Sequence, residues 1–382
     1  MTRVISVSSS RADVGVLAPV WAALSTRAEL HLFLTGMHQH KAAPAVEGVP
    51  AGAQVHRGGA DLGGAGGEKA AAAMAAIAEA AGALYGRVAP DAVLVMGDRL
   101  DMLPAATASL PFNIPLVHLH GGEVTEGAVD DRIRHALTKL AHMHCVSSES
   151  ARRRLLAMGE ETGRIVVTGA PGLDTLKAAP PLSVGDFARE AGLAGVAGDL
   201  AALRLVTVHP ETNAADPLAP LDAVLTALDR RPAPTLFTAP NSDPGGAAAR
   251  ERIEAFAAAR GWARFTANLG SRLYPNALRH AALMLGNSSS GIIEAGLFGL
   301  PVVNVGARQA GRERGPNVID VPNHADVVVA ALDRLGPTPA RAEPGTPYGA
   351  GGAGPKVAEV LLSLPPHAAL LAKPAPREAA HA

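Results

Sequence analysis

Short runs of apolar residues alternate along the chain with longer stretches in which apolar residues recur at helical spacing. The run 4–7 is bounded by three serines and followed by a helical pattern over 14–24. The alternation then repeats. Further strands are predicted at 30–34, 92–96, 115–119, 143–146 and 165–167, with helices at 68–86, 130–141 and 149–158. Strands that alternate with helices predict a parallel sheet covered on both faces.

A Pro-rich segment at 178–182 interrupts this pattern, which then restarts. Strands are predicted at 203–208, 235–238, 283–285 and 301–305, and a last helix at 356–362. Because 382 residues exceed what one hydrophobic core usually serves, two domains are expected. We predict an α/β fold with Rossmann-like domains at 1–177 and 184–364 and a mobile tail at 365–382. Ligands of such sheets bind after the strands, at their carboxyl ends.

The charge balance bears on the partners of the chain. Its 34 Lys and Arg residues are matched by 35 Asp and Glu residues, so net charge favours neither nucleic acid nor a membrane as partner, and any anion must be bound locally. We find no apolar run long enough for a signal peptide or a membrane span, and we expect a cytoplasmic protein. The single cysteine, Cys145, lies in a predicted strand and is expected to be a buried thiol.

In the second half, the segment 285–295 predicts an anion site. A strand ends there in small polar residues that open an apolar helix, and the free N–H groups and dipole of a helix start favour a phosphate. Glu294, one turn inside, can accept hydrogen bonds from ribose hydroxyls. Ordinary N-capping with a solvated Glu294 explains the same pattern. The candidate phosphate ligands are Ser288, Ser289, Ser290 and Gly291.

Arginines follow strands in both halves of the chain. Arg308, Arg312 and Arg314 follow the strand at 301–305 and predict a diphosphate clamp, although a solvated basic loop has the same sequence pattern. Arg11 follows the first strand. If the two sheets oppose each other, Arg11 becomes a second contact for phosphate or sugar.

Acidic residues and histidines cluster after strands of the first half. Asp98 follows the strand at 92–96 and a glycine, and it can act as a base, bind sugar hydroxyls or cap a helix. His120 and Glu123 straddle a Gly-Gly turn. Imidazoles, carboxylates and guanidiniums are unusually dense over 118–135 for a plain connector.

The start of the helix that follows carries Asp130, Asp131 and Arg134, of which Asp130 and Arg134 have the i, i+4 spacing of an ordinary ion pair. His209 ends a strand of the second half and is fixed by the proline after it. His118, His120, Glu123 and Asp130 also allow a metal site, but there is neither a His-Glu-x-x-His helix nor a paired Cys motif. We therefore expect no metal.

Five segments taken in order resemble the hydrolysing UDP-N-acetylglucosamine 2-epimerase family. They are Met96-Gly-Asp-Arg-Leu-Asp, His120-Gly-Gly-Glu, Asp130-Asp-Arg-Ile-Arg-His, Gly286-Asn-Ser-Ser-Ser-Gly-Ile-Ile-Glu and Gly306-Ala-Arg-Gln-Ala-Gly-Arg. The similarity extends from about residue 8 to about residue 321. It implies the glycosyltransferase-B architecture, in which two Rossmann-like domains face each other across a cleft.

The resemblance also implies a reaction. A base removes the proton on carbon 2, the nucleoside diphosphate leaves carbon 1, and water adds to the resulting glycal with inversion at carbon 2. By position, Asp98 and the Asp130–Asp131 pair resemble the catalytic carboxylates and Arg134 an orienting partner, while His209 resembles an acid, a base or a phosphate contact. Residues that resemble nucleotide ligands are Ser288, Ser289, Glu294 and Arg308.

One segment departs from relatives that make N-acetylmannosamine, which have a glutamate where this chain has His120. His120-Gly-Gly-Glu resembles instead the branch that acts on 2,4-diacetamido-trideoxy sugars for legionaminic-type nonulosonic acids. His120 or Glu123 is then expected to take over the role that this glutamate has in those relatives. The substrate is a UDP- or GDP-linked 2-acetamido sugar, the assembly a homodimer or homotetramer, and no cofactor is expected. A retaining glycosyltransferase and a non-catalytic nucleotide-sugar sensor remain as alternatives.

Overall fold

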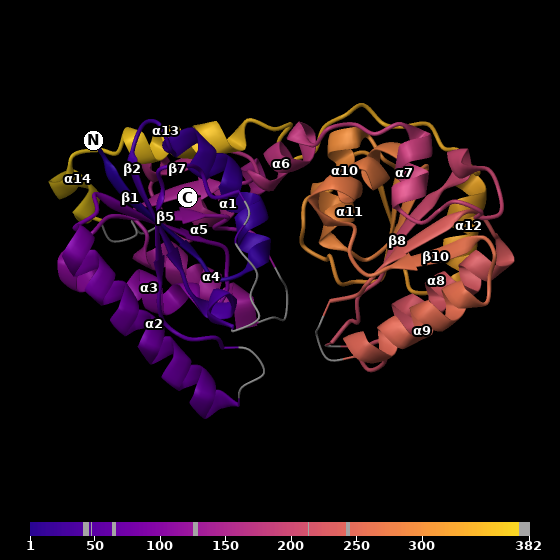
Figure 1. The fold of residues 1–382 in the computed structure, drawn as a ribbon, viewed down its shortest axis with the longest axis horizontal. Helices are drawn as coiled ribbons and strands as arrows, with labels where there is room; N and C mark the ends of the chain where they lie inside the picture. Colours follow the sequence, from indigo (N-terminus) through magenta and orange to yellow (C-terminus); the bar gives the residue numbers. More distant parts are fainter. Residues whose placement is uncertain are drawn as a thin grey trace, which may run out of the picture. The chain divides into compact units, whose positions relative to one another are not determined.

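The computed structural model describes residues 1–40, 46, 48–62, 66–124, 129–212, 214–241 and 245–373. The chain divides into two compact units (Figure 1). The first comprises residues 1–175 together with the chain from Gly351 onward, and the second comprises residues 176–350. Each unit contains one parallel sheet with helices packed on it. The predicted fold class, two Rossmann-like α/β domains, is confirmed.

The first unit is built on a seven-stranded sheet in the order β3-β2-β1-β4-β5-β6-β7 among its described residues. Its strands are β1 (Arg3–Ser8), β2 (Glu29–Leu34), β3 (Gln54–Arg57), β4 (Ala92–Met96), β5 (Leu116–Leu119), β6 (Met143–Val146) and β7 (Ile165–Val167). Its helices are α1 (Arg11–Leu24), α2 (Gly67–Val88), α3 (Met102–Thr107), α4 (Val129–Leu140), α5 (Glu149–Ala157), α6 (Gly172–Ala178, which runs into the second unit), α13 (Ala353–Leu362) and α14 (His367–Leu371), with 3-10 turns η1 (Gly36–Gln39), η2 (Leu110–Phe112) and η3 (Thr162–Arg164).

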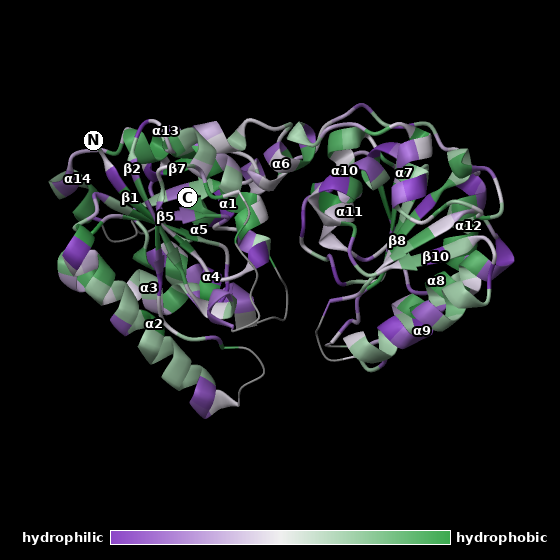
Figure 2. Cartoon of the chain, viewed as in Figure 1, coloured by the Kyte–Doolittle hydropathy of each residue, from purple (hydrophilic) through white to green (hydrophobic). Residues whose placement is uncertain are grey.

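The central strands of this sheet are buried on both faces, as expected when crossover helices cover a parallel sheet. α1 packs one face with its fully buried Trp21, whose indole N–H donates to the hydroxyl of Ser6 over 2.8 Å. On the other face, Tyr85 of α2 is also fully buried and donates to the carbonyl of Ala105 over 2.9 Å. The hydrophobic colouring in Figure 2 accordingly gathers on the strands. Cys145 of β6 is buried as predicted, and burial raises the pKa of its thiol to about 12.

The second unit has a six-stranded sheet in the order β10-β9-β8-β11-β12-β13 among its described residues. Its strands are β8 (Arg204–Thr207), β9 (Thr235–Thr238), β10 (Ala263–Thr266), β11 (Leu283–Gly286), β12 (Val302–Val305) and β13 (Val318–Val321). Its helices are α7 (Val184–Glu190), α8 (Ala219–Arg230), α9 (Gly246–Ala258), α10 (Gly270–His280), α11 (Ser289–Ile293) and α12 (Ala325–Leu335), with 3-10 turns η4 (Leu200–Ala202) and η5 (Ala295–Phe298). Phe237 of β9 and Ile253 of α9 lie in its core.

The sequence pattern missed three strands, and all three lie at the edge of a sheet. They are β3, β10 and β13. The prediction looked for short apolar runs, which mark strands that are buried on both faces. An edge strand has fewer neighbours, and β3 shows the consequence because Gln54, Val55 and Arg57 are exposed. Polar residues at an edge also discourage unwanted pairing with another chain.

The end of the described chain packs on the first unit, whereas the sequence pattern placed residues up to 364 in the second. α13 lies against α1 so closely that a Cβ on Gly354 would come within 2.7 Å of Pro19. The carboxylate of Asp174 accepts hydrogen bonds from the first two amides of α13, of Ala353 and Gly354, over 3.1 and 2.7 Å. The boundary differs because helix periodicity does not reveal which sheet a helix covers.

Residues 365–373, which were expected to be a mobile tail, form α14 and the turns beside it, and residues 374–382 lie outside the described part. Leu370 is buried, and the guanidinium of Arg164 donates to its carbonyl over 2.9 Å. Lys373 donates to the carbonyl of Ala141 at the end of α4 over 2.7 Å. Cations at helix ends complement the helix dipole, which explains why these two basic residues hold the segment in place.

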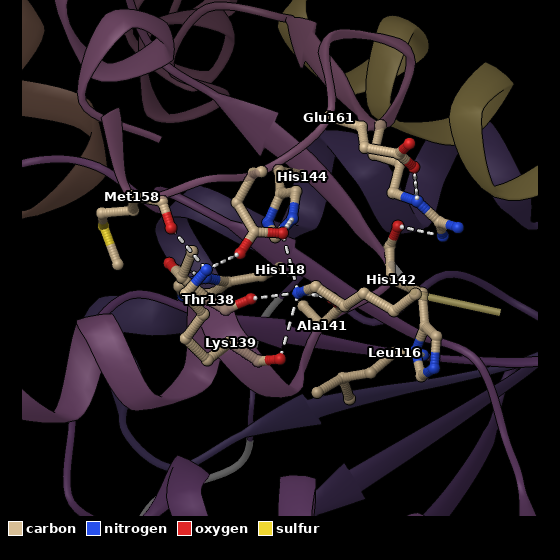
Figure 3. Close-up of polar contacts among 12 residues, drawn as sticks. Leu116, His118, Thr138, Lys139, Ala141, His142, His144, Met158 and Glu161 are labelled. Carbon is tan, nitrogen blue, oxygen red and sulfur yellow. Dashed lines mark hydrogen bonds and ion pairs between the residues drawn. The ribbon is translucent and has the colours of Figure 1, made fainter. Parts of the chain in front are cut away.

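Lys373 also meets Glu160, the centre of a buried ionic cluster. The carboxylate of Glu160 lies 2.7 Å from Lys373, 2.8 Å from Lys139 and 3.1 Å from His144. Lys139 and His144 reach this region from α4 and β6 (Figure 3). Burial by itself raises the pKa of the Glu160 carboxyl, but its hydrogen bonds to His144, Lys139 and Lys373 outweigh this effect and lower the pKa to about 2.

We predict that Glu160→Gln destabilises the first unit by about 2–4 kcal/mol at pH 7, because it removes the buried negative charge that pairs with Lys139 and Lys373. The pKa of Glu160 is lower in the folded state than its ordinary value of 4.5. Its contribution is therefore complete above that pH and is lost as the pH falls toward 2. Urea unfolding at pH 7 and pH 3 should show the difference between variant and wild type shrinking. Glu254→Gln, in an exposed ion pair with Arg250, is the matched control with little effect at either pH.

Candidate active site

In the first unit, the turn after β4 carries Asp98, and a buried histidine binds the backbone of this turn. Gly97 has a φ of 69°, a left-handed conformation that glycine adopts without strain. Its carbonyl lies 2.8 Å from Nε2 of His118, whose Nδ1 lies 3.2 Å from the hydroxyl of Thr138 on α4. Complete burial lowers the pKa of His118 to about 3, so the ring stays neutral. His118 therefore joins the Asp98 turn to α4.

Arg134 of α4 gathers the acidic groups of this site. Its side chain is only 3% exposed and forms ion pairs with Asp98 and Asp131, and it donates to the carbonyl of Glu123 over 2.7 Å. The structure thus brings together four predicted residues from three chain segments. Within α4, an ion pair joins Asp131 to Arg134 at the i, i+3 spacing, and the pair expected between Asp130 and Arg134 at i, i+4 stays a prediction. Asp130 lies beside Asp131 in the first turn of α4.

His120 and Glu123 form a second group beside this one. Nδ1 of His120 lies 2.6 Å from Oε1 of Glu123, and the same oxygen accepts a hydrogen bond from the hydroxyl of Ser147 over 2.7 Å. The sequence analysis missed Ser147, although it directly follows β6 and so satisfies the rule that site residues follow strands.

The Gly-Gly turn between His120 and Glu123 is pressed against α5. A Cβ on Gly122, whose φ is 74°, would lie 2.4 Å from the carbonyl oxygen of Ala151. Arg154 donates to the carbonyl of Gly122 over 2.9 Å. Contact with α5 therefore fixes the turn, and with it the spacing between His120 and Glu123.

In the turn after β1, Asp13 and Arg99 hold the serines that precede Arg11. Asp13 accepts hydrogen bonds from the amides of Ser9 and Ser10 over 2.6 and 2.9 Å, and Arg99 donates to the hydroxyl of Ser9 over 2.9 Å. Arg11 is exposed at the first position of α1. Within the described part of the chain, no hydrogen bond joins Arg11 to the other predicted site residues. Its role as a phosphate or sugar contact stays a prediction.

In the second unit, His209 is held after β8 by two asparagines to which the sequence analysis assigned no role. The amide of His209 donates to Asn287 over 2.7 Å, and Asn287 donates back to its carbonyl over 2.9 Å. The amide of Asn241 donates to Nδ1 of His209 over 2.9 Å. Burial, helped by the charge of Arg308, lowers the pKa of His209 to about 4. Near neutral pH the ring is uncharged, and its proton lies on Nε2.

The serine segment after β11 forms the start of α11 as predicted. Ser288 caps the helix by accepting from the amide of Ser290 over 3.3 Å, and Ser289 and Gly291 lie in the helix itself. The hydroxyl of Ser290 donates to the carboxylate of Glu294 and is paired with that of Tyr274. Glu294 is therefore not a solvated residue, and burial raises the pKa of its carboxyl. This short segment therefore contains both a helix cap, at Ser288, and a hydrogen bond between the hydroxyl of Ser290 and the carboxylate of Glu294.

The loop after β12 places Arg308 next to that segment. Oε1 of Glu211 accepts from the amides of Ala307 and Arg308 over 2.8 and 2.9 Å, and the guanidinium of Arg308 donates to the carbonyl of Asn287 over 3.4 Å. Arg314 does not join it in a clamp. It pairs with Asp320 over 3.0 Å and donates to the carbonyl of Gln309 over 2.6 Å, contacts that fix the loop itself.

The described residues contain no cluster of three or more His, Cys, Asp or Glu side chains able to hold a metal ion. No helix among them is both long and apolar enough to cross a membrane.

Comparison with solved structures defines the class of protein. The fold matches a UDP-GlcNAc 2-epimerase from Neisseria meningitidis with a TM-score of 0.75 and 19% identity, covering 94% of this chain and 99% of that one. It matches the Methanocaldococcus jannaschii UDP-GlcNAc 2-epimerase with a TM-score of 0.67 and 16% identity, covering 94% and 99%. The chain is thus an α/β protein with the two-unit fold of these enzymes.

The family follows from sequence. The family model described as UDP-N-acetylglucosamine 2-epimerase matches residues 22–362, and the chain belongs to this family of enzymes. It is 37% identical over 285 residues, 74% of each chain, to the UDP-N,N'-diacetylbacillosamine 2-epimerase (hydrolyzing) of Legionella pneumophila. It is 30% identical over 325 residues to the UDP-N-acetylglucosamine 2-epimerase of Neisseria meningitidis, 84% of this chain and 83% of that one. The family resemblance stated from the motifs is confirmed.

We predict that Gly122→Ala disrupts the first unit's site far more than Gly97→Ala. Both glycines have positive φ, so alanine costs about 1–2 kcal/mol of backbone strain at either position. Only at Gly122 does the new methyl also collide with the backbone of α5, because nothing lies within 4 Å of a Cβ at Gly97. Thermal unfolding of the two variants should show the larger drop in Tm for Gly122→Ala. Equal drops would contradict the packing argument.

Proposed function

We propose that this enzyme is a hydrolysing nucleotide-sugar 2-epimerase. It converts a nucleoside-diphospho-2-acetamido hexose and water into the free 2-epimer and the nucleoside diphosphate. The observation that carries the proposal is the grouping of Asp98, Asp131 and Glu123 around the buried Arg134, in a chain that belongs to this family. Such a grouping offers acid–base chemistry next to a fixed positive charge.

The chemistry divides into elimination and hydration. In the elimination, a base takes the proton from carbon 2, the electron pair of that bond forms the double bond between carbons 1 and 2, and the nucleoside diphosphate leaves with the electrons of the carbon 1–oxygen bond. In the hydration, carbon 2 receives a proton on its opposite face and water adds to carbon 1. Two proton-transfer groups are therefore needed. The candidates are Asp98, His120, Glu123, Asp130 and Asp131.

The nucleotide is assigned to the second unit. We propose that Ser288, Ser289 and Gly291 hold a phosphate through hydroxyl and amide groups and that Glu294 accepts hydrogen bonds from the ribose. His209 serves as a neutral donor toward the diphosphate through Nε2–H, since its Nδ1 already accepts the amide of Asn241. Arg308 adds the positive charge, and Arg11 is a further candidate contact for phosphate or sugar.

The substrate we propose is a 2,4-diacetamido-trideoxy hexose linked to UDP or GDP, as in legionaminic-type nonulosonic acid synthesis. Two relatives support this choice. The Legionella pneumophila enzyme is described above, and the GDP/UDP-N,N'-diacetylbacillosamine 2-epimerase (hydrolyzing) of Campylobacter jejuni is 38% identical over 234 residues, 60% of each chain. The replacement of a glutamate by His120 supports the same branch. UDP-N-acetylglucosamine is the alternative substrate.

A panel of UDP- and GDP-linked amino sugars incubated in deuterated water tests the reaction. We expect free sugar that is epimerised and deuterated at carbon 2, together with one equivalent of nucleoside diphosphate, detected by NMR and chromatography. Transfer of the sugar to an acceptor without free 2-epimer would indicate a retaining glycosyltransferase instead. Binding without turnover would indicate a nucleotide-sugar sensor.

We predict that Asp98→Asn and Glu294→Gln separate chemistry from nucleotide binding. Asp98→Asn should lower kcat by about 10²- to 10⁴-fold and leave the Kd for the nucleoside diphosphate unchanged. Glu294→Gln should weaken nucleotide binding by about tenfold or more because it changes the acceptor offered to the ribose. Isothermal titration and steady-state kinetics measure both effects, with exposed Glu254→Gln as the control. The assignment fails if Asp98→Asn alters only the Kd.

We also propose that the enzyme works in the cytoplasm as a homodimer or homotetramer. Both follow from the resemblance to the family rather than from any contact between subunits. Size-exclusion chromatography with light scattering decides the assembly, and a monomer at micromolar concentration would contradict it.

A further inference from the structure

We propose that His120 is the base that removes the proton from carbon 2, and that Glu123 is the positioning residue that makes it one. This inference deepens the proposed function and rests on it. It replaces the expectation of a carboxylate base with an imidazole held by a carboxylate and a serine.

The contacts of Glu123 decide which nitrogen of His120 is basic. An ionised carboxylate only accepts hydrogen bonds, so Nδ1 of His120, at 2.6 Å from Oε1, must carry the proton. In the neutral ring Nε2 then keeps its lone pair. Within the described part of the chain, Nε2 has no hydrogen-bond partner. Ser147 donates to the same carboxylate oxygen over 2.7 Å and so fixes its position.

The other two histidines of the candidate sites have the opposite arrangement. Nε2 of His118 lies 2.8 Å from a carbonyl oxygen, which only accepts, so the proton of this ring is on Nε2. Nδ1 of His209 accepts from the amide of Asn241, which again leaves the proton on Nε2. Both rings are donors at Nε2 and cannot accept a proton there. Of these three histidines, His120 is the one whose Nε2 can accept a proton.

The backbone of His120 supports a functional role. Its φ is 65°, in the left-handed region that costs a residue with a Cβ about 1–2 kcal/mol. Strained residues of this kind gather at active sites, where the surrounding structure holds them. A glycine would suit the conformation better, so the fold does not require a histidine there.

Charged and titratable groups surround the pair from several elements. Glu123 contacts the ring directly, while Arg134 of α4 and Arg154 of α5 donate to the carbonyls of Glu123 and Gly122. His118 of β5 interacts electrostatically with both members of the pair, and it stays neutral. Arg134 also binds Asp98 and Asp131, so its charge is shared among carboxylates. The negative charge of Glu123 remains the partner closest to the ring.

In the proposed step, the lone pair on Nε2 of His120 takes the proton from carbon 2. The electrons of the carbon–hydrogen bond form the double bond, and the nucleoside diphosphate leaves with the electrons of its bond to carbon 1. The imidazolium that results is stabilised by Glu123. Because the configuration at carbon 2 inverts, the proton that returns to carbon 2 comes from another group on the opposite face.

His120→Gly tests the step without straining the fold. We expect it to be as stable as wild type or more so, since glycine relieves the positive φ, and to lose nucleoside diphosphate release by about 10²-fold or more. Added imidazole should raise the rate of nucleoside diphosphate release by His120→Gly at least tenfold. His120→Asn, which also tolerates this φ but has no basic nitrogen, is the control that imidazole should not rescue. Release of glycal and nucleoside diphosphate by His120→Gly at the wild-type rate would overturn the proposal.

Glu123→Gln tests the positioning role. A glutamine can face the ring with either its oxygen or its amino group, so it no longer dictates the tautomer. We expect kcat to fall by about 10²-fold or more with little change in KM, and imidazole not to restore it, because the ring is still present. A Glu123→Gln variant with wild-type kcat would overturn the role of Glu123.

A measurement without substrate separates this proposal from the proposed function. Nitrogen-15 NMR of the histidine rings, with the His120 signals identified by their loss in His120→Gly, should show a proton on Nδ1 and none on Nε2 in the neutral ring. A neutral ring with its proton on Nε2 would overturn the proposal even if the enzyme is an epimerase. If wild type turns over no nucleotide sugar, the proposed function fails while the NMR result still decides the state of His120.

Discussion

The candidate site of the first unit depends on one buried guanidinium. Arg134 is almost wholly removed from solvent, and a buried charge is stable only when it is paired and hydrogen-bonded. Its partners come from the turn after β4, from the loop after β5 and from α4 itself. Because the guanidinium has a fixed, planar geometry, it sets the positions of Asp98, Asp131 and Glu123 relative to one another. Without that cation the three segments would bring together negative charges that repel.

A second layer keeps these segments in place. The neutral His118 joins the Asp98 turn to α4 through the hydroxyl of Thr138, and the Gly-Gly turn lies so close to α5 that only glycine fits at position 122. Beyond the site, the ionic cluster at Glu160 anchors the last described segment beneath α4. Hydrogen bonds and close backbone contacts thus extend from the proposed reacting groups to the far side of the unit.

In the second unit, polar side chains also hold the segments of the candidate site together. The side chain of Asn287 ties the end of β8 to the end of β11, and Glu211 ties the loop after β12 to the segment after β8. These polar residues each join two strand ends through backbone groups. The sequence analysis found the residues proposed to meet the ligand. It assigned no role to Asn287, Asn241 and Ser147, because their function is to hold neighbours that are distant in sequence.

The sequence by itself determined the class of fold, the central strands of both sheets and the segments that carry the candidate site. Those features depend on local periodicity and on the rule that chemistry follows strand ends in a parallel sheet. Only the tertiary structure decided the edge strands, the packing of α13 and α14 on the first unit, and the choice of Asp98 and Asp131 as ion-pair partners of Arg134. It also decided that Nδ1 of His120 faces the carboxylate of Glu123. The edge strands, the packing of α13 and α14 and the pairing of Asp98 with Arg134 depend on contacts between residues far apart in the chain. The Asp131–Arg134 and His120–Glu123 contacts are local, but they depend on side-chain geometry. Neither kind of contact leaves a periodic mark in the sequence.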